Sequence, residues 1–339
     1  MRELCSELIC HPLPTENCHA STVLPLPDGT VLAAWFGGSR EGRLDVKIWA
    51  ARRTKDGWQP PIPICYRQNL PHWNPVLHLQ RDGTVRLYFK VGRRIASWRT
   101  FTCVSADGGR SFDAPVPLVP GDRGGRGPVK NKCLRLSDGR LLAPASSEAH
   151  GWHCFIDTSF DDGRTWQKGQ KISTGRVAPI LNRRNDYCAD PIPMIQPTLW
   201  ESVPGHVHLL ARTAVGCAYR SDSADYGATW CTAYPTPIPN NNSGLDLVRV
   251  PDGTLYLVSN PVAENWGERS PLVLSRSTDN GAHFTPVLTL EPEKPGSEFS
   301  YPAITAANDT LYITYTYERT DLAFRMIALD SSERNGAAE

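Results

Sequence analysis

Long apolar runs are missing from this sequence of 339 residues. No stretch approaches the ~18 apolar residues that a membrane-spanning helix needs, which excludes a membrane protein of that kind. An excess of one charge is missing as well, because 36 Lys and Arg residues face 35 Asp and Glu residues. A formal net charge of +1 produces no global field that would attract nucleic acid or an anionic membrane surface.

Spacings typical of metal sites are also missing. The ten cysteines form no CxxC pair, and the nine histidines show no HExxH pattern. We therefore expect no metal and no other cofactor, and we interpret the cysteines as reduced, mostly buried thiols. The first 21 residues contain three glutamates and no apolar segment like that of a secretory signal peptide. These features predict a cytoplasmic location.

What the sequence has is a repeat. Four segments share the pattern Ser-x-Asp-x-Gly-x-x-aromatic and are called Asp boxes here; they begin at Ser105, Ser159, Ser223 and Ser277, at spacings of 54, 64 and 54 residues. A shortened fifth copy, TKDGW, begins at Thr54. In such a segment Asp can hydrogen-bond its own backbone, Gly can adopt a positive φ, and the aromatic ring can pack on a sheet. We interpret the Asp boxes as structural turns without a chemical role.

A second series of turns follows the same period. Six short turns each precede a stretch rich in β-branched or aromatic residues, at Asp28-Gly29, Asp82-Gly83, Asp138-Gly139, Gly205, Asp252-Gly253 and Asn308-Asp309. No segment between them has a helical period of useful length, which disfavours alternating βαβ folds. Six units of about four strands predict an all-β protein, a six-bladed β-propeller in which residues 1–339 form a single domain. An array of two-sheet sandwiches is the alternative.

A closed ring leaves no sheet edge exposed. We expect the sixth blade to close by pairing of the N-terminal stretch Thr22–Leu26 with the last strands, near Tyr312–Arg319. The inner strands of all blades converge around the central channel. Polar residues that precede or interrupt these strands are therefore the candidates for function.

Each unit offers such residues. The first units contain a Gly-Gly loop with Arg40, Glu41 and Asp45, then Asn74, then two lysines around an asparagine (Lys130, Asn131 and Lys132), with Glu148 at the end of the third unit. The later units contain Gln196, Arg212, Asp246, Arg269, Glu298 and Tyr301. Mobile surface charge is the alternative interpretation of the loop, and solvated lysines that block strand pairing are the alternative for the lysine pair.

Two arginines occupy equivalent places in neighbouring units. Arg212 and Arg269 lie 11 and 8 residues before the Asp-box serine of their units. This equivalence predicts that both point to the same place, together with Lys130 or Lys132. Arginine binds carboxylates with a planar fork of donors, so we expect a locally cationic channel in a neutral protein.

The chain resembles the sialidase (neuraminidase) superfamily, and most closely its bacterial and plant branch of BNR/Asp-box proteins. Besides the Asp boxes, an ordered set of segments carries this resemblance over nearly the whole chain: FGGSREG, HWNPVL, GPVKNK, IQPTL, LLART, NNNSGLD, ERSPLVLSRSTDNG and EFSYPAI. The resemblance implies arginines that bind a substrate carboxylate, a tyrosine nucleophile with a glutamate beside it, and an acid/base residue on a loop of the first blade.

These roles can be placed residue by residue. Arg212 and Arg269 look like the second and third arginines, and Tyr301 looks like the nucleophile. Because Tyr301 precedes Pro302, we expect its backbone to be extended. Glu41 and Asp45 are the candidates for the acid/base residue. The further residues expected to bind substrate are His19, Arg40, Asn74, Lys130, Asn131, Lys132, Gln196 and Asp246.

Three positions depart from the sialidase pattern, one of them the loop with Glu41 and Asp45, which is shorter than the acid/base loop of the family. His19 stands where the first arginine is expected, which weakens or reshapes the carboxylate site. Gln196 stands where the glutamate partner of the tyrosine is expected, and an amide cannot take up the proton. Glu298, three residues before Tyr301, is the possible replacement.

The resemblance implies an exo-acting glycoside hydrolase that removes a terminal acidic sugar, sialic acid or a related keto-sugar acid. One alternative is a carbohydrate-binding propeller without catalysis, which Gln196 favours. Another is a lyase that acts on acidic oligosaccharides, with Tyr301 or His19 as base. The expected partner is an acidic carbohydrate rather than nucleic acid or membrane, and the sequence predicts no oligomeric state.

Overall fold

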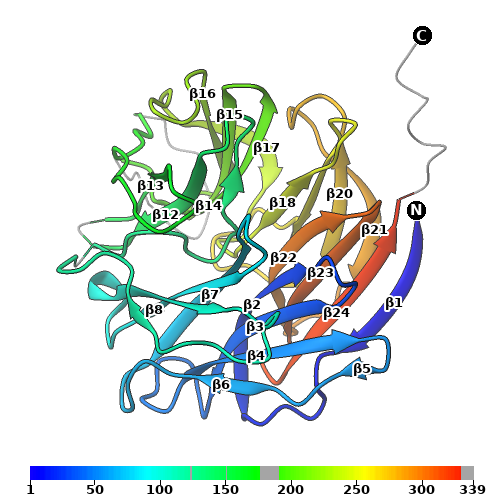
Figure 1. Cartoon of the computed structure of the whole chain (residues 1–339). Helices are drawn as coiled ribbons and strands as arrows, with labels where there is room; N and C mark the ends of the chain where they lie inside the picture. The colour runs from blue at the N-terminus through cyan, green and yellow to red at the C-terminus, as the bar shows by residue number, and fades with distance from the viewer. Residues whose placement is uncertain (123, 150, 176–190, 330–339) are drawn as a thin grey trace.

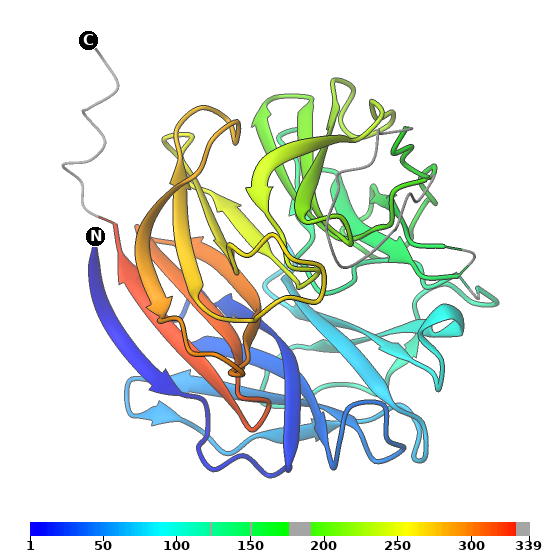
Figure 2. The same ribbon diagram turned by 180° about the vertical axis from the view of Figure 1, so that it is seen from behind.

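The computed structural model of the chain describes residues 1–122, 124–149, 151–175 and 191–329. In these ranges, six antiparallel sheets form a ring, and Figures 1 and 2 show them radiating from a common centre. The described helical structure is limited to one short 3-10 helix, η1 (Ile95–Ser97), and no described helix could span a bilayer. The all-β, six-bladed β-propeller expected from the repeats is confirmed.

The first three sheets follow one another along the chain. The first contains β2 (Asn17–Pro25), β3 (Val31–Gly38), β4 (Lys47–Thr54), β5 (Gly57–Trp58) and β6 (Ile62–Ile64). The second contains β7 (His72–Leu79), β8 (Val85–Val91), β9 (Arg99–Ser105) and β10 (Val116–Pro117). The third contains β11 (Leu134–Arg135), β12 (Leu141–Ser147) and β13 (His153–Ser159).

The remaining sheets complete the ring. The fourth contains β14 (Met194–Val203), β15 (His206–Thr213), β16 (Cys217–Ser223) and β17 (Tyr234–Pro239). The fifth contains β18 (Asp246–Arg249), β19 (Leu255–Ser259), β20 (Leu272–Ser277) and β21 (Thr285–Glu291). The sixth contains β22 (Phe299–Ala307), β23 (Thr310–Tyr317), β24 (Asp321–Ala328) and the N-terminal strand β1 (Arg2–Leu8).

The closing strand differs from the one expected. Strand β1 pairs with β24, from the Arg2–Ala328 pair to the Leu8–Ala323 pair, and Figure 1 shows the two side by side. The stretch Thr22–Leu26, expected to close the sixth blade, instead belongs largely to β2 and pairs with β3 in the first blade. An earlier strand supplies the closure, and β2 packs against β22 and β23 from the neighbouring blade.

Local turn chemistry explains the repeat. Each of the six short turns joins the first two strands of its blade, and in four of them the Asp carboxylate accepts the backbone N–H two residues later. Each Asp box follows the third strand of its blade. In the first one, Asp107 accepts the backbone N–H groups of Arg110 and Ser111, and Ser105 accepts that of Gly109. These hydrogen bonds of Asp107 and Ser105 all lie within the turn, as expected of a structural element.

The blades are held together by apolar side chains that alternate along the strands. On β23, Leu311, Ile313 and Tyr315 are fully buried and pack with β22 and β24 residues. The nine cysteines in the described ranges are all free thiols. Only four of them, Cys18, Cys103, Cys133 and Cys154, are buried, fewer than the sequence predicts, so the core depends on apolar burial between the sheets.

The innermost strand of each blade begins near a residue with a left-handed backbone: Ala20, Asn74, Lys130, Gln196, Asn242 and Tyr301. In four sheets this residue coincides with a β-bulge, where the register between the first two strands shifts. The extended backbone expected at Tyr301 is wrong, since its φ is +51° within the bulge between Ser300 and Ala303. These bulges re-aim side chains at the centre of the ring.

Candidate functional site

Side chains from several blades converge around Tyr301, the left-handed residue of β22. Its hydroxyl accepts a hydrogen bond of 2.5 Å from Nη1 of Arg212, which β15 of the fourth blade carries. Its ring centroid lies 5.7 Å from the guanidinium carbon of Arg212 and 5.7 Å from that of Arg269. The two arginines that occupy equivalent places in the sequence therefore meet on one aromatic ring.

Arg212 is held by neutral partners. Its Nε donates to Asn242 (2.7 Å) and its Nη1 donates to Gln196 (3.2 Å), while the rings of Trp152 and Trp266 lie 5.3 and 5.8 Å from its guanidinium carbon. None of these contacts neutralises its charge. Arg212 is 3% exposed, so a cation without a bonded carboxylate is kept next to the tyrosine hydroxyl.

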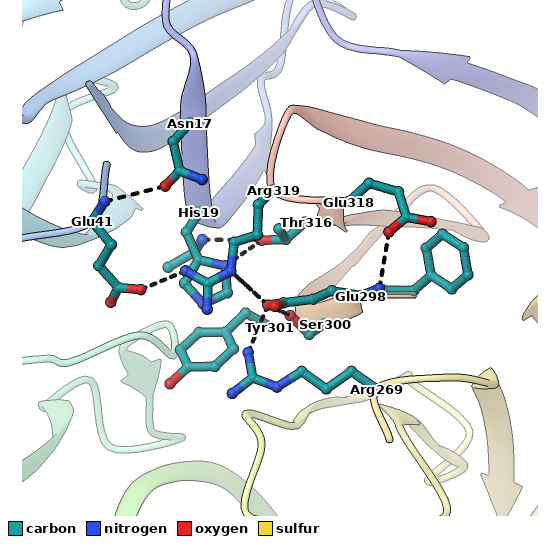
Figure 3. A network of polar contacts seen from close by, with 12 residues as sticks. Asn17, His19, Glu41, Arg269, Glu298, Ser300, Tyr301, Thr316, Glu318 and Arg319 are labelled. Atoms are coloured by element: carbon teal, nitrogen blue, oxygen red, sulfur yellow. Dashed lines mark hydrogen bonds and ion pairs between the residues drawn. The ribbon is translucent and has the colours of Figure 1, made fainter. Parts of the chain in front are cut away.

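A chain of alternating charges lies on the other side of the tyrosine (Figure 3). The Glu298 carboxylate accepts hydrogen bonds from Arg269 (2.6 Å), Ser300 (2.7 Å) and Arg319 (2.7 Å) through one oxygen, and Arg319 continues to Glu41. Burial opposes ionisation of Glu298, but the charges of Arg269 and Arg319 and these hydrogen bonds hold its pKa below the ordinary value. Glu298 is thus an ionised anchor for two arginines.

His19 lies on the ring of Tyr301, with the two ring centroids 4.1 Å apart. Its Nδ1 bonds the Thr316 hydroxyl at 2.8 Å. Burial lowers the pKa of His19 well below its usual range, and the guanidinium groups of Arg319 and Arg269 lower it further. The imidazole is therefore neutral and supplies an aromatic face instead of the expected cation.

The expected role of Glu298 as proton acceptor for Tyr301 is not supported by the geometry. Figure 3 shows the hydroxyl end of Tyr301 turned away from Glu298, and in the described ranges no carboxylate is hydrogen-bonded to it. The bulge at Tyr301 explains this, because it redirects the side chain relative to that of its near neighbour. Gln196 does lie at the site, but its amide oxygen only accepts a hydrogen bond from Arg212.

The lysines expected to bind substrate are used inside the protein. Lys130 is buried and donates to the side chain of Asn131 and to the carbonyls of Leu245 and Pro302. Asn131 in turn donates to the carbonyls of Gln196 (3.0 Å) and of the following proline (3.1 Å). Their donors satisfy backbone groups of neighbouring blades, and the Pro302 contact fixes the backbone next to Tyr301.

A second internal contact corrects the expectation for Lys132 and Asp246. Both Asp246 oxygens accept hydrogen bonds from Lys132 at 2.9 Å, and one accepts from Thr198 and the other from the Ile304 backbone. Because Asp246 is 1% exposed and fully engaged, this ion pair and its hydrogen bonds join the third, fourth, fifth and sixth blades instead of facing a ligand.

The first-blade loop contributes one of its three candidates. Glu41 accepts a hydrogen bond from Arg319. Asp45 instead accepts hydrogen bonds from the backbone N–H and the hydroxyl of Ser39 within its own loop. Burial opposes the ionisation of Asp45, yet these Ser39 hydrogen bonds keep its pKa below the ordinary value, which is unsuitable for a proton donor. Arg40 is exposed and makes no side-chain hydrogen bond with the described residues.

Asn74 keeps its candidate position. It is 6% exposed at the bulge of β7, and its side chain makes no hydrogen bond within the described part of the chain. Its amide is therefore available to a ligand, in contrast to the engaged amide of Asn131.

Several members of the site are not among the residues predicted from the sequence. Arg319 lies in the turn between β23 and β24, outside the repeating phase that singled out the other arginines. Asn242 and the rings of Trp152 and Trp266 surround Arg212. Trp266 is 64% exposed, which is unusual for tryptophan. This exposure is visible only in the structure, so the sequence had no signal for Trp266.

Glu148 lies near Arg212 as well. Burial raises the pKa of its carboxyl group, while Arg212 and a hydrogen bond with Trp152 oppose that shift. Glu148 therefore holds its proton to a higher pH than an ordinary glutamate does.

Comparisons with known proteins agree with this architecture. A family model described as a BNR repeat-like domain matches residues 29–313. Similar solved structures include a protein of unknown function from Dyadobacter fermentans, with a TM-score of 0.72 and 15% identity over 97% of this chain and 99% of that chain. No curated protein matches the chain in sequence.

Sialidases are among the similar structures. The Trypanosoma rangeli sialidase in complex with the inhibitor DANA has a TM-score of 0.68 and 16% identity, over 93% of this chain and 55% of that chain. The NanB sialidase from Streptococcus pneumoniae has a TM-score of 0.68 and 14% identity, over 96% of this chain and 70% of that chain. This chain thus spans about half the length of the Trypanosoma protein, and at these identities the likeness establishes the fold.

Proposed function

Since the chain belongs to the family of BNR repeat-like domains and has the propeller fold of the sialidases, we propose that it is an exo-acting glycoside hydrolase. Its substrate would carry a terminal acidic sugar, sialic acid or a related keto-sugar acid. The observation that carries the proposal is Tyr301, whose hydroxyl is bonded to Arg212 and whose ring lies beside Arg212 and Arg269. Solved structures of the similar Trypanosoma sialidase hold sialic acid and a covalent intermediate with 2,3-difluorosialic acid.

The chemistry of such a sugar favours a tyrosine nucleophile. A 2-keto sugar acid has its carboxylate on the anomeric carbon, so a carboxylate nucleophile would be repelled, whereas a phenol is not. Arginines beside the phenol attract the substrate carboxylate and hold it against the site. Arg212 can both stabilise the phenol oxygen, to which it donates a hydrogen bond, and attract the substrate carboxylate, because no carboxylate of the described residues is bonded to it.

The proposed reaction has two displacements. In the first, the Tyr301 oxygen bonds to the anomeric carbon, the glycosidic bond breaks, and the leaving oxygen takes a proton from Glu41. The phenol proton passes to water, and Arg212 stabilises the negative charge that develops on the phenol oxygen. In the second, water attacks the anomeric carbon, Glu41 takes a proton from it, the bond to Tyr301 breaks, and the phenol oxygen regains a proton from water. We assign the acid/base role to Glu41, in its protonated form for the first step, because it lies at the arginine cluster and Asp45 does not.

Aryl glycosides of sialic acid, keto-deoxy sugar acids and uronic acids, supplied to the purified protein, test the activity. On the glycoside that is turned over, Tyr301→Phe should lower kcat by a factor on the order of 10² or more, while the affinity for the released acid persists. Tyr66→Phe is the matched control, because Tyr66 is an exposed tyrosine that stacks on Phe101 in the second blade. A near-native kcat for Tyr301→Phe would exclude the tyrosine nucleophile.

A carbohydrate-binding propeller without catalysis is the second candidate. It is favoured by Gln196 and by the lack of a carboxylate bonded to the Tyr301 hydroxyl in the described ranges. This candidate predicts saturable binding of an acidic sugar without release of an aglycone from any glycoside of the panel. Calorimetry and product analysis on the same samples therefore distinguish the two functions.

A further inference from the structure

Arg319 brings a third guanidinium group to the site from an unexpected direction. It lies in the tight turn between β23 and β24, where Glu318 and Arg319 both have left-handed backbones, with φ of +51° and +59°. From there its Nε reaches the same Glu298 oxygen that Arg269 contacts, and its Nη1 reaches Glu41. Figure 3 shows the Arg319 and Arg269 side chains approaching Glu298 from different sides.

The three arginines share one property. In the described ranges, Nη2 of Arg212, Arg269 and Arg319 makes no hydrogen bond, and none of these atoms is among the buried, unpartnered ones. Each guanidinium group is thus oriented by bonds on its other nitrogens and keeps donors for a ligand. A group that is already oriented loses little side-chain freedom when it binds.

The charges of this cluster do not cancel. Glu298 is ionised, Glu41 is uncharged when it holds the proton for the leaving oxygen, burial raises the pKa of Glu148 near Arg212, and His19 is neutral. Three guanidinium groups therefore exceed the negative charge around them. The site thus has a local excess of positive charge in a protein that is nearly neutral as a whole. A bound carboxylate would offset this excess.

We propose that Arg319 completes a three-arginine site for the carboxylate of the acidic sugar, so that the last blade supplies the cation that the first blade lacks at His19. This inference rests on the proposed function, since it names a specificity-determining residue of the same site. Glu298 and Glu41 orient Arg319, and His19 lies on the ring of Tyr301 as an uncharged group. The site then distinguishes an acidic sugar from its uncharged counterpart through Arg319.

The test measures charge selectivity. Calorimetry would compare N-acetylneuraminic acid with its methyl ester, and 3-deoxy-manno-oct-2-ulosonic acid with its methyl ester, because each ester lacks the negative charge. The wild-type protein should bind one of the acids at least tenfold more tightly than its ester. Arg319→Gln should weaken binding of that acid about tenfold while the affinity for the ester changes less than twofold, and Arg319→Lys should fall between.

The controls separate the possible failures. Arg164→Gln removes an exposed arginine of an Asp box and should leave both affinities unchanged, and thermal unfolding reports whether the Arg319 variants fold. Wild-type selectivity for the acid in Arg319→Gln would overturn the role of Arg319 and leave the proposed function intact. A wild-type protein that does not prefer either acid over its ester would overturn the proposed function and, with it, this inference.

Discussion

The ionised Glu298 connects two arginines of the cluster, Arg269 and Arg319, and its replacement by glutamine tests this connection. Glu298→Gln keeps the shape of the side chain and removes the charge that Arg269 and Arg319 share through one oxygen. The two guanidinium groups then face each other across a neutral amide. Arg269 loses its paired carboxylate, whereas Arg319 keeps Glu41.

The magnitude follows from the burial of the three groups. The side chains of Glu298 and Arg319 are each 24% exposed, and that of Arg269 is 17% exposed. Breaking a fully buried ion pair from one side costs about 3–5 kcal/mol, and an exposed pair contributes about 0–1 kcal/mol. For this partly buried cluster we expect Glu298→Gln to lower the free energy of unfolding by about 2 kcal/mol. In a chain of this length the melting temperature should fall by about 3 °C.

The pH dependence gives the assay a second readout. The folded-state pKa of Glu298 lies below its unfolded value, so its stabilisation is present above the unfolded pKa and is lost as pH falls through the folded pKa. Denaturant unfolding at about pH 7 and at successively lower pH should show the difference between wild type and Glu298→Gln shrinking below about pH 4. Glu293→Gln, at an exposed position, serves as the control. A Glu298→Gln protein as stable as wild type at neutral pH would refute the reasoning, as would a difference that does not change with pH.

Two further predictions concern the surroundings of Tyr301. Burial raises the pKa of Glu148, and its ionisation places a negative charge near Arg212; affinity for an acidic sugar should therefore fall as pH rises through that pKa, and calorimetry from about pH 4 to pH 8 should show a flatter profile for Glu148→Gln. A Cβ at Gly244 would lie 2.9 Å from Cε of Lys130 and 3.3 Å from Cγ of Tyr301; Gly244→Ala should lower the free energy of unfolding by about 1–3 kcal/mol and reduce turnover, as measured by denaturant unfolding and kcat. A pH profile of Glu148→Gln identical to that of wild type, or a Gly244→Ala protein with native stability and kcat, would contradict these assignments.

The sequence predicted what depends on local chemistry. Asp107 and its counterparts bond within their own turns, so the Asp boxes and the short turns revealed six units without any knowledge of distant contacts. Arg212 and Arg269 were found for the same reason, because equivalent places in repeated units lead to equivalent places around the ring. Their meeting at Tyr301 is a property of the repeat.

The remaining features depend on partners far along the chain. The closing strand was misplaced because Arg2–Leu8 and Thr22–Leu26 both lie near the N-terminus, and neither pattern specifies whether β24 or β3 is its partner. Lys130 was predicted to bind substrate, whereas its acceptors include carbonyls more than 100 residues away along the chain. Arg319 lies in a turn whose sequence position has no counterpart among the repeated arginines.

The pairing of β1 with β24 also determines how the ring responds to mechanical load. Arg2 pairs with Ala328, so the beginning of the chain and the end of β24 lie at the same end of this strand pair, as Figure 1 shows. A force that pulls these two ends apart would act across the interstrand bonds one after another, as in the opening of a zip, and not along all of them at once. Strand β24 would be the next to detach, and the turn that carries Arg319 leads directly into it. Tension on these two strands would therefore pass to the arginine cluster through the turn that carries Arg319, and to the first blade through β2, which follows β1.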